Sequence, residues 1–129
     1  MLLNRIVGFV VIITIIAGWF AIYYFRNSPV QNPNGKARVT GTCGDTMEIF
    51  LEFSHNRVSD SSCWSNGCAY SLNCAYAATN LALGKSPEEI FNIDADLVQR
   101  SIGGLPKDHM HCANLAVDTL YSAVDDYMR

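Results

Sequence analysis

The chain has 129 residues, of which 50% are hydrophobic and 16% are charged, and its formal net charge at pH 7 is −3. After residue 26 it holds seven basic and twelve acidic residues, so this part carries a net charge of −5. A nucleic-acid-binding domain needs a basic surface, and this balance therefore argues against binding to nucleic acid. The ~100 residues of this part are enough for one small domain with a single hydrophobic core.

Residues 6–25 form an uncharged and almost entirely apolar segment. As a helix, about 20 such residues span the ~30 Å hydrocarbon core of a bilayer. The alternative is a signal peptide, but the segment is long, has only Arg5 as an early basic residue, and ends in the aromatic run 19–25. We therefore expect residues 1–26 to be a single-pass transmembrane anchor. The basic residues that follow favour a cytoplasmic or matrix-facing domain.

A linker and a first strand are expected after the anchor. Residues 27–35 are rich in proline, asparagine and glycine, which predicts a linker before a domain at residues 36–129. Residues 36–42 are expected to form a short strand. In residues 47–53, apolar residues at every second position are typical of a half-buried strand.

A turn and helices are expected to complete the domain. His55 and Asn56 predict a turn that leads into a returning strand over residues 57–65. We expect helices over residues 69–83, from Ser86 onwards, over residues 94–101 and over residues 109–127, with Asp108 as the cap of the last one. Helical spacing places Leu72, Ala75, Tyr76, Thr79 and Leu83 on the buried face of the first of these helices, and Cys112 on the inner face of the last.

Three short motifs carry the chemistry, and they are Cys43-Gly44-Asp45, Gly67-Cys68 and His111-Cys112. Thiolates combined with a carboxylate or an imidazole suit zinc or an iron–sulfur cluster. Cys68 and Cys112 lie near expected helix starts, where the pKa of a thiol is lowered. Spacing alone leaves open whether these cysteines bind metal or are simply buried, because the chain has no compact pair of cysteines.

The other cysteines and histidines have simpler interpretations. Cys63 and Cys74 are expected to be small buried side chains rather than ligands. His55 and His109, taken alone, are expected at the surface. The total of five cysteines is odd, which argues against a secreted disulfide scaffold and favours a reducing compartment.

The chain resembles the IscU/NifU amino-terminal family of iron–sulfur scaffolds over residues 32–128. The segments found in that family's order and spacing are Asn32–Gly35, Cys43–Met47, Gly67–Ala69, Gly84–Lys85, Gly103–Pro106 and His111–Ala116, and Ala123–Tyr127 is similar to its last helix. The resemblance implies an α+β domain in which helices pack on a three-stranded antiparallel sheet.

The resemblance also implies a site and a role. Cys43, Cys68 and Cys112 match the family's ligand cysteines, Asp45 matches its aspartate, and His111 matches a histidine that can be the fourth ligand. Cys112 also matches the usual persulfide acceptor. Such scaffolds are not enzymes. They receive sulfur from a cysteine desulfurase, use iron and electron donors, and pass a [2Fe-2S] cluster to acceptor proteins; zinc can take the place of the cluster.

Two departures from the family pattern leave alternatives open. A membrane helix stands where members usually have a soluble segment, and His109 occupies the position of a lysine in the segment before His111-Cys112. An accessory or structural subunit of a membrane complex, holding zinc or an empty site, is therefore the second hypothesis. A thiol hydrolase using Cys68 or Cys112 with a histidine is the third, although no signature of such a family is present.

Overall fold

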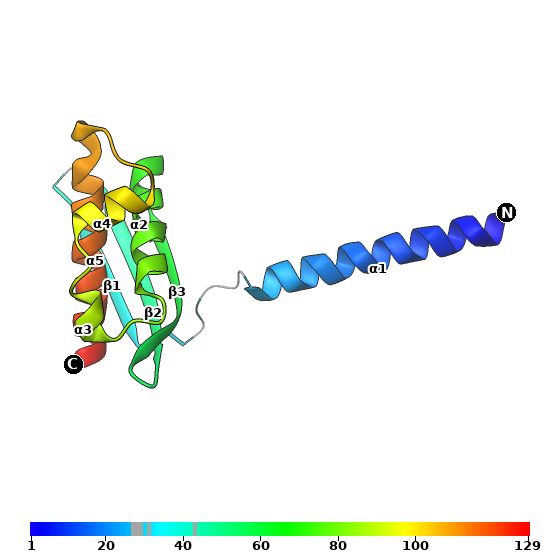
Figure 1. Cartoon of the computed structure of the whole chain (residues 1–129), viewed down its shortest axis with the longest axis horizontal. Helices are drawn as coiled ribbons and strands as arrows, with labels where there is room; N and C mark the ends of the chain where they lie inside the picture. Colours follow the sequence, from blue (N-terminus) through cyan, green and yellow to red (C-terminus); the bar gives the residue numbers. More distant parts are fainter. Residues whose placement is uncertain (27–29, 31, 43) are drawn as a thin grey trace.

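The computed structural model describes residues 1–26, 30, 32–42 and 44–129. Helix α1 (Leu2–Arg26) precedes a domain in which three strands are followed by helices (Figure 1). The elements are β1 (Gly35–Thr40), β2 (Thr46–Ser54), β3 (Arg57–Ser65), α2 (Ala69–Ala82), α3 (Pro87–Ile90), α4 (Ala95–Ser101), the 3-10 helix η1 (Lys107–His109) and α5 (Met110–Met128). The strands form an antiparallel sheet in the order β1-β2-β3. The predicted α+β fold is therefore confirmed.

The sheet follows the period of its sequence. Met47, Ile49 and Leu51 of β2 are fully buried, whereas the intervening side chains are half-buried. His55 and Asn56 have φ values of 54° and 61°, which is the left-handed geometry of a two-residue hairpin turn. Strand β1 begins at Gly35, one residue before the expected boundary. This hairpin pairs β2 with β3, and the buried side chains of β2 give the helices an apolar face.

Helices α2 and α5 cover the buried face of the sheet, and α4 packs against both (Figure 1). The expected inner face of α5 is confirmed at Cys112, which is fully buried. The face predicted for α2 is partly wrong, because Tyr76 and Leu83 are 52% and 43% exposed. The buried stripe of α2 is instead centred on small residues such as Cys74 and Ala78, which allow close packing on β3 and α5.

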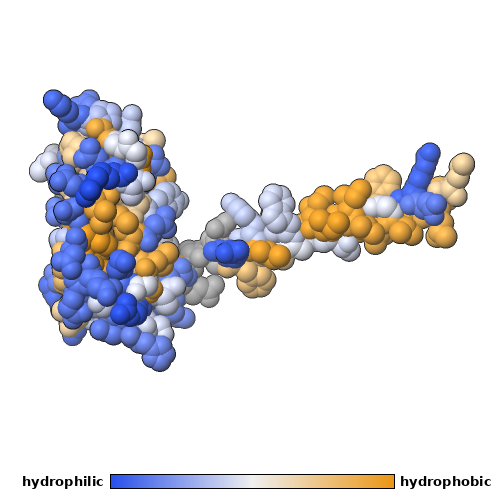
Figure 2. All heavy atoms as spheres, in the orientation of Figure 1, coloured by the Kyte–Doolittle hydropathy of each residue, from blue (hydrophilic) through white to orange (hydrophobic). Residues whose placement is uncertain are grey.

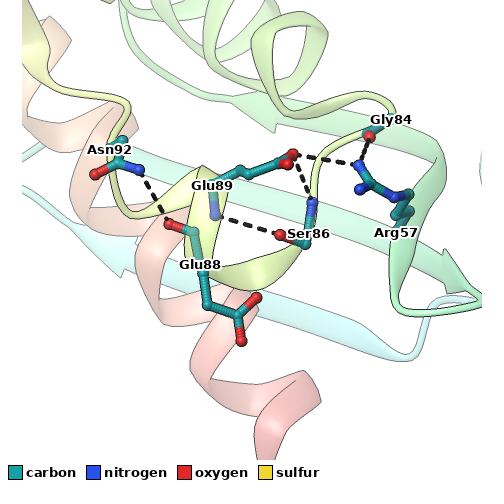
Figure 3. A network of polar contacts seen from close by, with 6 residues as sticks. All are labelled: Arg57, Gly84, Ser86, Glu88, Glu89 and Asn92. Carbon is teal, nitrogen blue, oxygen red and sulfur yellow. Dashed lines mark hydrogen bonds and ion pairs between the residues drawn. The ribbon is translucent and has the colours of Figure 1, made fainter.

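A polar network fixes the start of α3 (Figure 3). The backbone N–H of Glu89 donates to the Ser86 hydroxyl, and the Glu89 carboxylate accepts from the Ser86 N–H, which completes a capping box. Arg57, at the start of β3, donates to the Gly84 carbonyl at 2.8 Å and lies 3.3 Å from Glu89 Oε2. The network therefore ties the hairpin to the connection between α2 and α3.

Helix α1 has no buried residue, and its mean hydropathy is 2.5 over an 18-residue window. Hydrophobic residues cover most of its N-terminal half (Figure 2). With 25 residues it is long and apolar enough to cross a membrane. It is the one such helix among the residues that the structure describes.

Candidate metal and cluster site

Three connections meet at one end of the sheet, the upper end in Figure 1. The β1–β2 connection holds Asp45, the β3–α2 connection holds Gly67 and Cys68, and the start of α5 holds Cys112. Gly44 has a φ of 89° within the first connection, which is closed by a 2.8 Å bond from the Gly41 N–H to the Asp45 carbonyl. Cys43, predicted as a ligand, lies outside the described residues.

Ser71 is the shared neighbour of three predicted ligands. Its buried hydroxyl donates to Asp45 Oδ2 at 3.0 Å and lies 3.4 Å from Cys112 Sγ. The same oxygen lies 4.0 Å from Cys68 Sγ. One side chain from the first turn of α2 therefore brings a carboxylate and two sulfur atoms from three separate segments to one place.

Gly67 is required by the close approach of its neighbours. A Cβ at this position would lie 2.5 Å from Asp45 Oδ2 and 2.7 Å from Ser71 Oγ, both far inside van der Waals contact. The missing side chain therefore leaves the space in which the Asp45 carboxylate sits. This need arises from packing, since the backbone of Gly67 is not among the glycines with positive φ.

Two overlapping groups of side chains have ligand atoms within 4.8 Å of one another. The first is Asp45, His111 and Cys112, which are all predicted site residues. The second is Cys68, His109 and Cys112. His109 was expected at the surface, but its side chain is only 30% exposed, and its ring packs at a tilt against Tyr70.

The thiols of the site differ in their protonation. The backbone N–H of Ser71 at the start of α2 is the main cause of a lowered pKa for the exposed Cys68 thiol. Burial raises the pKa of the Cys112 thiol, so the expected lowering at this helix start is wrong for Cys112. Here the loss of contact with water outweighs the benefit of the helix start.

The remaining cysteines agree with their simpler interpretation. Cys74 is fully buried, and its burial raises the pKa of its thiol to about 12. Cys63 is half-buried, and burial raises the pKa of this thiol too. No disulfide joins cysteines within the described part of the chain.

The start of α5 is built differently from the expectation. The 3-10 turn η1 precedes the helix, His109 is the residue at its N-cap, and no side chain caps it. The Asp108 cap predicted from the sequence is therefore wrong. Because η1 continues into α5, the position of Asp108 falls inside a helical turn and its carboxylate points to solvent, with 82% exposure.

Sequence reasoning missed Ser71, the contact role of Gly67, and His109. Ser71 follows Cys68 by three positions, which places both on the first turn of a helix, and this spacing is the signal that was available. His109 precedes Cys112 by three positions in the same way. For Gly67 the sequence offered no signal, because only the fold brings Asp45 and Ser71 against it.

An α+β domain with thiol, carboxylate and imidazole groups gathered at one end of its sheet defines a class of metal- or cluster-binding domain. Comparison with known proteins identifies the family within this class. Residues 26–129 match the family described as the NifU-like N-terminal domain. The chain is 44% identical, over 109 residues, to "Iron-sulfur cluster assembly scaffold protein IscU 1" of Archaeoglobus fulgidus, a match that covers 77% of this chain and 71% of that protein.

A more distant relative and a solved structure support the same family and the same fold. The IscU scaffold protein of Aquifex aeolicus is 27% identical over 88 residues, covering 67% of this chain and 56% of that protein. The crystal structure of a NifU-like N-terminal protein from Brucella abortus has the same fold, with a TM-score of 0.57 at 16% identity, covering 78% of this chain and 83% of that one. The chain therefore belongs to the IscU/NifU-like family of iron–sulfur cluster assembly scaffolds, whose members are scaffolds rather than enzymes.

Proposed function

We propose that this chain builds a [2Fe-2S] cluster at the end of the sheet and passes it to acceptor proteins. The proposed ligands are Cys43, Asp45, Cys68, His111 and Cys112. The observation that carries the proposal is the convergence of Asp45, Cys68 and Cys112 on the Ser71 hydroxyl. More candidate ligands than a cluster needs would let one ligand leave while an acceptor takes over.

The two described site thiols suit different steps. Cys68 is exposed and has a lowered pKa, so its thiolate can meet an arriving iron ion first. Cys112 is the proposed persulfide acceptor, whose thiolate would attack the outer sulfur of a desulfurase persulfide and release the desulfurase thiolate. Cys112 has no exposed surface, so the start of α5 must open before this sulfur can meet a partner.

We also propose that residues 1–26 anchor the chain in a membrane through a single span, with a linker that ends before Gly35, where β1 and the domain begin. The length and hydropathy of α1 support this anchor. An anchored scaffold has a raised local concentration near a membrane-bound client. Its domain would face the cytoplasm or the mitochondrial matrix. Retention in the membrane pellet after carbonate extraction is expected, and full release would contradict the anchor.

The scaffold role is tested by anaerobic purification of the full chain in detergent, followed by measurement of iron, sulfide and zinc. We expect Cys43→Ala, Cys68→Ala and Cys112→Ala each to abolish the visible absorbance of a reconstituted cluster. Cys63→Ala is the matched control, since this half-buried thiol lies on β3, and it should load normally.

Asp45→Ala and transfer measurements complete this test. Removing the carboxylate should lengthen the lifetime of the cluster, as the family resemblance implies for this aspartate. The loaded chain should give its cluster to an apo [2Fe-2S] acceptor protein. Normal loading in all three cysteine variants would falsify the scaffold role. Stoichiometric copurification with a membrane complex, without transferable iron, would favour the accessory-subunit alternative.

A further inference from the structure

His109 packs against Tyr70, and one of its ring nitrogens lacks a hydrogen-bond partner. The buried Nδ1 atom of His109 has no hydrogen-bond partner, and it is the one buried side-chain nitrogen or oxygen left so among the residues described. Its ring packs against Tyr70 at a tilt of 31°, with centroids 4.4 Å apart. Buried polar atoms are normally paired, so this nitrogen requires an explanation.

Candidate metal ligands lie close to the His109 ring. Ligand atoms of Cys68, His109 and Cys112 lie within 4.8 Å of one another. In tetrahedral zinc sites, metal–ligand bonds of about 2.0–2.3 Å place neighbouring ligands roughly 3.3–3.8 Å apart. A contraction of about 1 Å, which rotamer changes can supply, would therefore close these three side chains around one ion.

We propose that His109 is an additional ligand of this site, which binds a zinc or ferrous ion together with Cys68 and Cys112. This inference rests on the proposed function and adds a residue to it. The second triad shares Cys112 with the triad of Asp45, His111 and Cys112, and the His109 and His111 rings are 6.1 Å apart. An ion can therefore exchange ligands between the two triads while remaining bound to Cys112.

The second ring nitrogen supports coordination through Nδ1. His109 Nε2 lies 3.9 Å from Asp108 Oδ2, and the Asp108 side chain is 82% exposed and free to rotate toward it. A histidine that binds metal commonly donates its other ring N–H to a carboxylate, which orients the ring and fixes its tautomer. Asp108 would accept that hydrogen bond from His109 after its side chain rotates to close the 3.9 Å separation.

The test measures zinc affinity by chelator competition with the full chain in detergent. The variants are His109→Asn and, as a matched control, His55→Asn, which makes the same change in the exposed hairpin turn where asparagine also tolerates positive φ. Loss of residues that only support a metal ligand lowers affinity about 10–100-fold, so removing the ligand His109 should raise the zinc dissociation constant at least about tenfold. His55→Asn should leave it unchanged.

A spectroscopic readout separates coordination from packing. With Co²⁺ as probe, His109→Asn should change the d–d bands of the bound ion, and His109→Cys should restore zinc affinity while strengthening the sulfur-to-cobalt charge-transfer band. A packing role would instead lower the melting temperature of the metal-free chain and leave both the Co²⁺ spectrum and the zinc affinity unchanged. That result would overturn the inference.

The outcomes also separate this inference from the proposed function. Unchanged zinc binding in His109→Asn, with loss of zinc in Cys68→Ala and Cys112→Ala, removes His109 from the site and leaves the scaffold role in place. Zinc binding that survives in both cysteine variants contradicts the ligand set itself, and with it both proposals.

Discussion

The two ends of the domain differ in how completely their polar groups are paired. At the end near α3, charged and polar groups pair with one another, as in the capping box of Ser86 and Glu89 and the bonds from Arg57 (Figure 3). At the other end, the Asp45 carboxylate accepts a side-chain hydrogen bond from Ser71, and His109 Nδ1 is the buried side-chain atom without a hydrogen-bond partner among the described residues. Satisfied groups stabilise a fold, whereas unsatisfied buried groups cost stability and remain available to a ligand.

The groups that stabilise the fold and the groups that can bind a ligand therefore lie at opposite ends of the sheet. Both ends rest on the same core, in which Met47, Ile49 and Leu51 of β2 pack against the helices. Substitutions at the α3 end should therefore change the free energy of unfolding without changing the loading of the site. Substitutions at the cluster end should change the loading of the site, whether or not they also change the free energy of unfolding.

The largest effect is expected from Gly67→Ala. The added Cβ would displace the Asp45 carboxylate and the Ser71 hydroxyl, which its position approaches to 2.5 and 2.7 Å. We expect reconstituted cluster absorbance to be lost, while overpacking costs about 1–3 kcal/mol of unfolding free energy. Cluster absorbance and denaturant unfolding of the same preparation measure the two effects.

Gly84→Ala at the opposite end is the matched control. A Cβ there meets open space, but the φ of 75° is unfavourable for alanine. This variant should lose about 1–2 kcal/mol of stability and load its cluster normally. Equal loss of loading in both variants would show that the two ends are not independent.

The next effect concerns the pH dependence of cysteine alkylation. Iodoacetamide reacts with thiolates, and Cys68 is exposed with a lowered pKa, while burial raises the pKa of Cys112 and that of Cys74 to about 12. In the metal-free chain at pH 7, Cys68 should react faster than either, because a lower pKa leaves a larger fraction of the thiol as thiolate.

The direction of each pKa shift decides how the alkylation rate of each thiol changes with pH. As the pH rises, the rate for Cys68 should reach half of its plateau at a lower pH than an ordinary thiol does, and the rate for Cys112 at a higher pH. Peptide mapping by mass spectrometry resolves the cysteines. Identical profiles for Cys68 and Cys112 would contradict the assigned environments.

The smallest effect is expected from Ser86→Ala, which removes the cap of α3. Loss of an N-cap costs about 0.5–2 kcal/mol, and cluster loading should not change. Ser122→Ala on α5, whose hydroxyl donates to its own helix at the Asp118 carbonyl, should stay within about 0.5 kcal/mol of the wild type. A loss of loading in Ser86→Ala would break the separation of the two ends.

Local patterns in the sequence predicted most of the fold. The alternation in β2, the turn at His55 and Asn56, and the start of α3 at Pro87 depend on neighbours along the chain, and the structure has all three. The face of α2 was less predictable, because Tyr76 and Leu83 fit a helical stripe equally well until the position of α5 is known. Propensity sets a helix, but packing sets which side of it is buried.

The residue types of the site, the family of the chain and the apolar helix α1 could be predicted from the sequence, because motif spacing, composition and length are properties of the chain alone. Only the tertiary structure decided that Ser71 joins Asp45 to Cys112, that His109 lies beside two thiols, and that burial raises the pKa of Cys112. These facts depend on distances between segments far apart in the chain, and those distances are set by how α2 and α5 pack on the sheet.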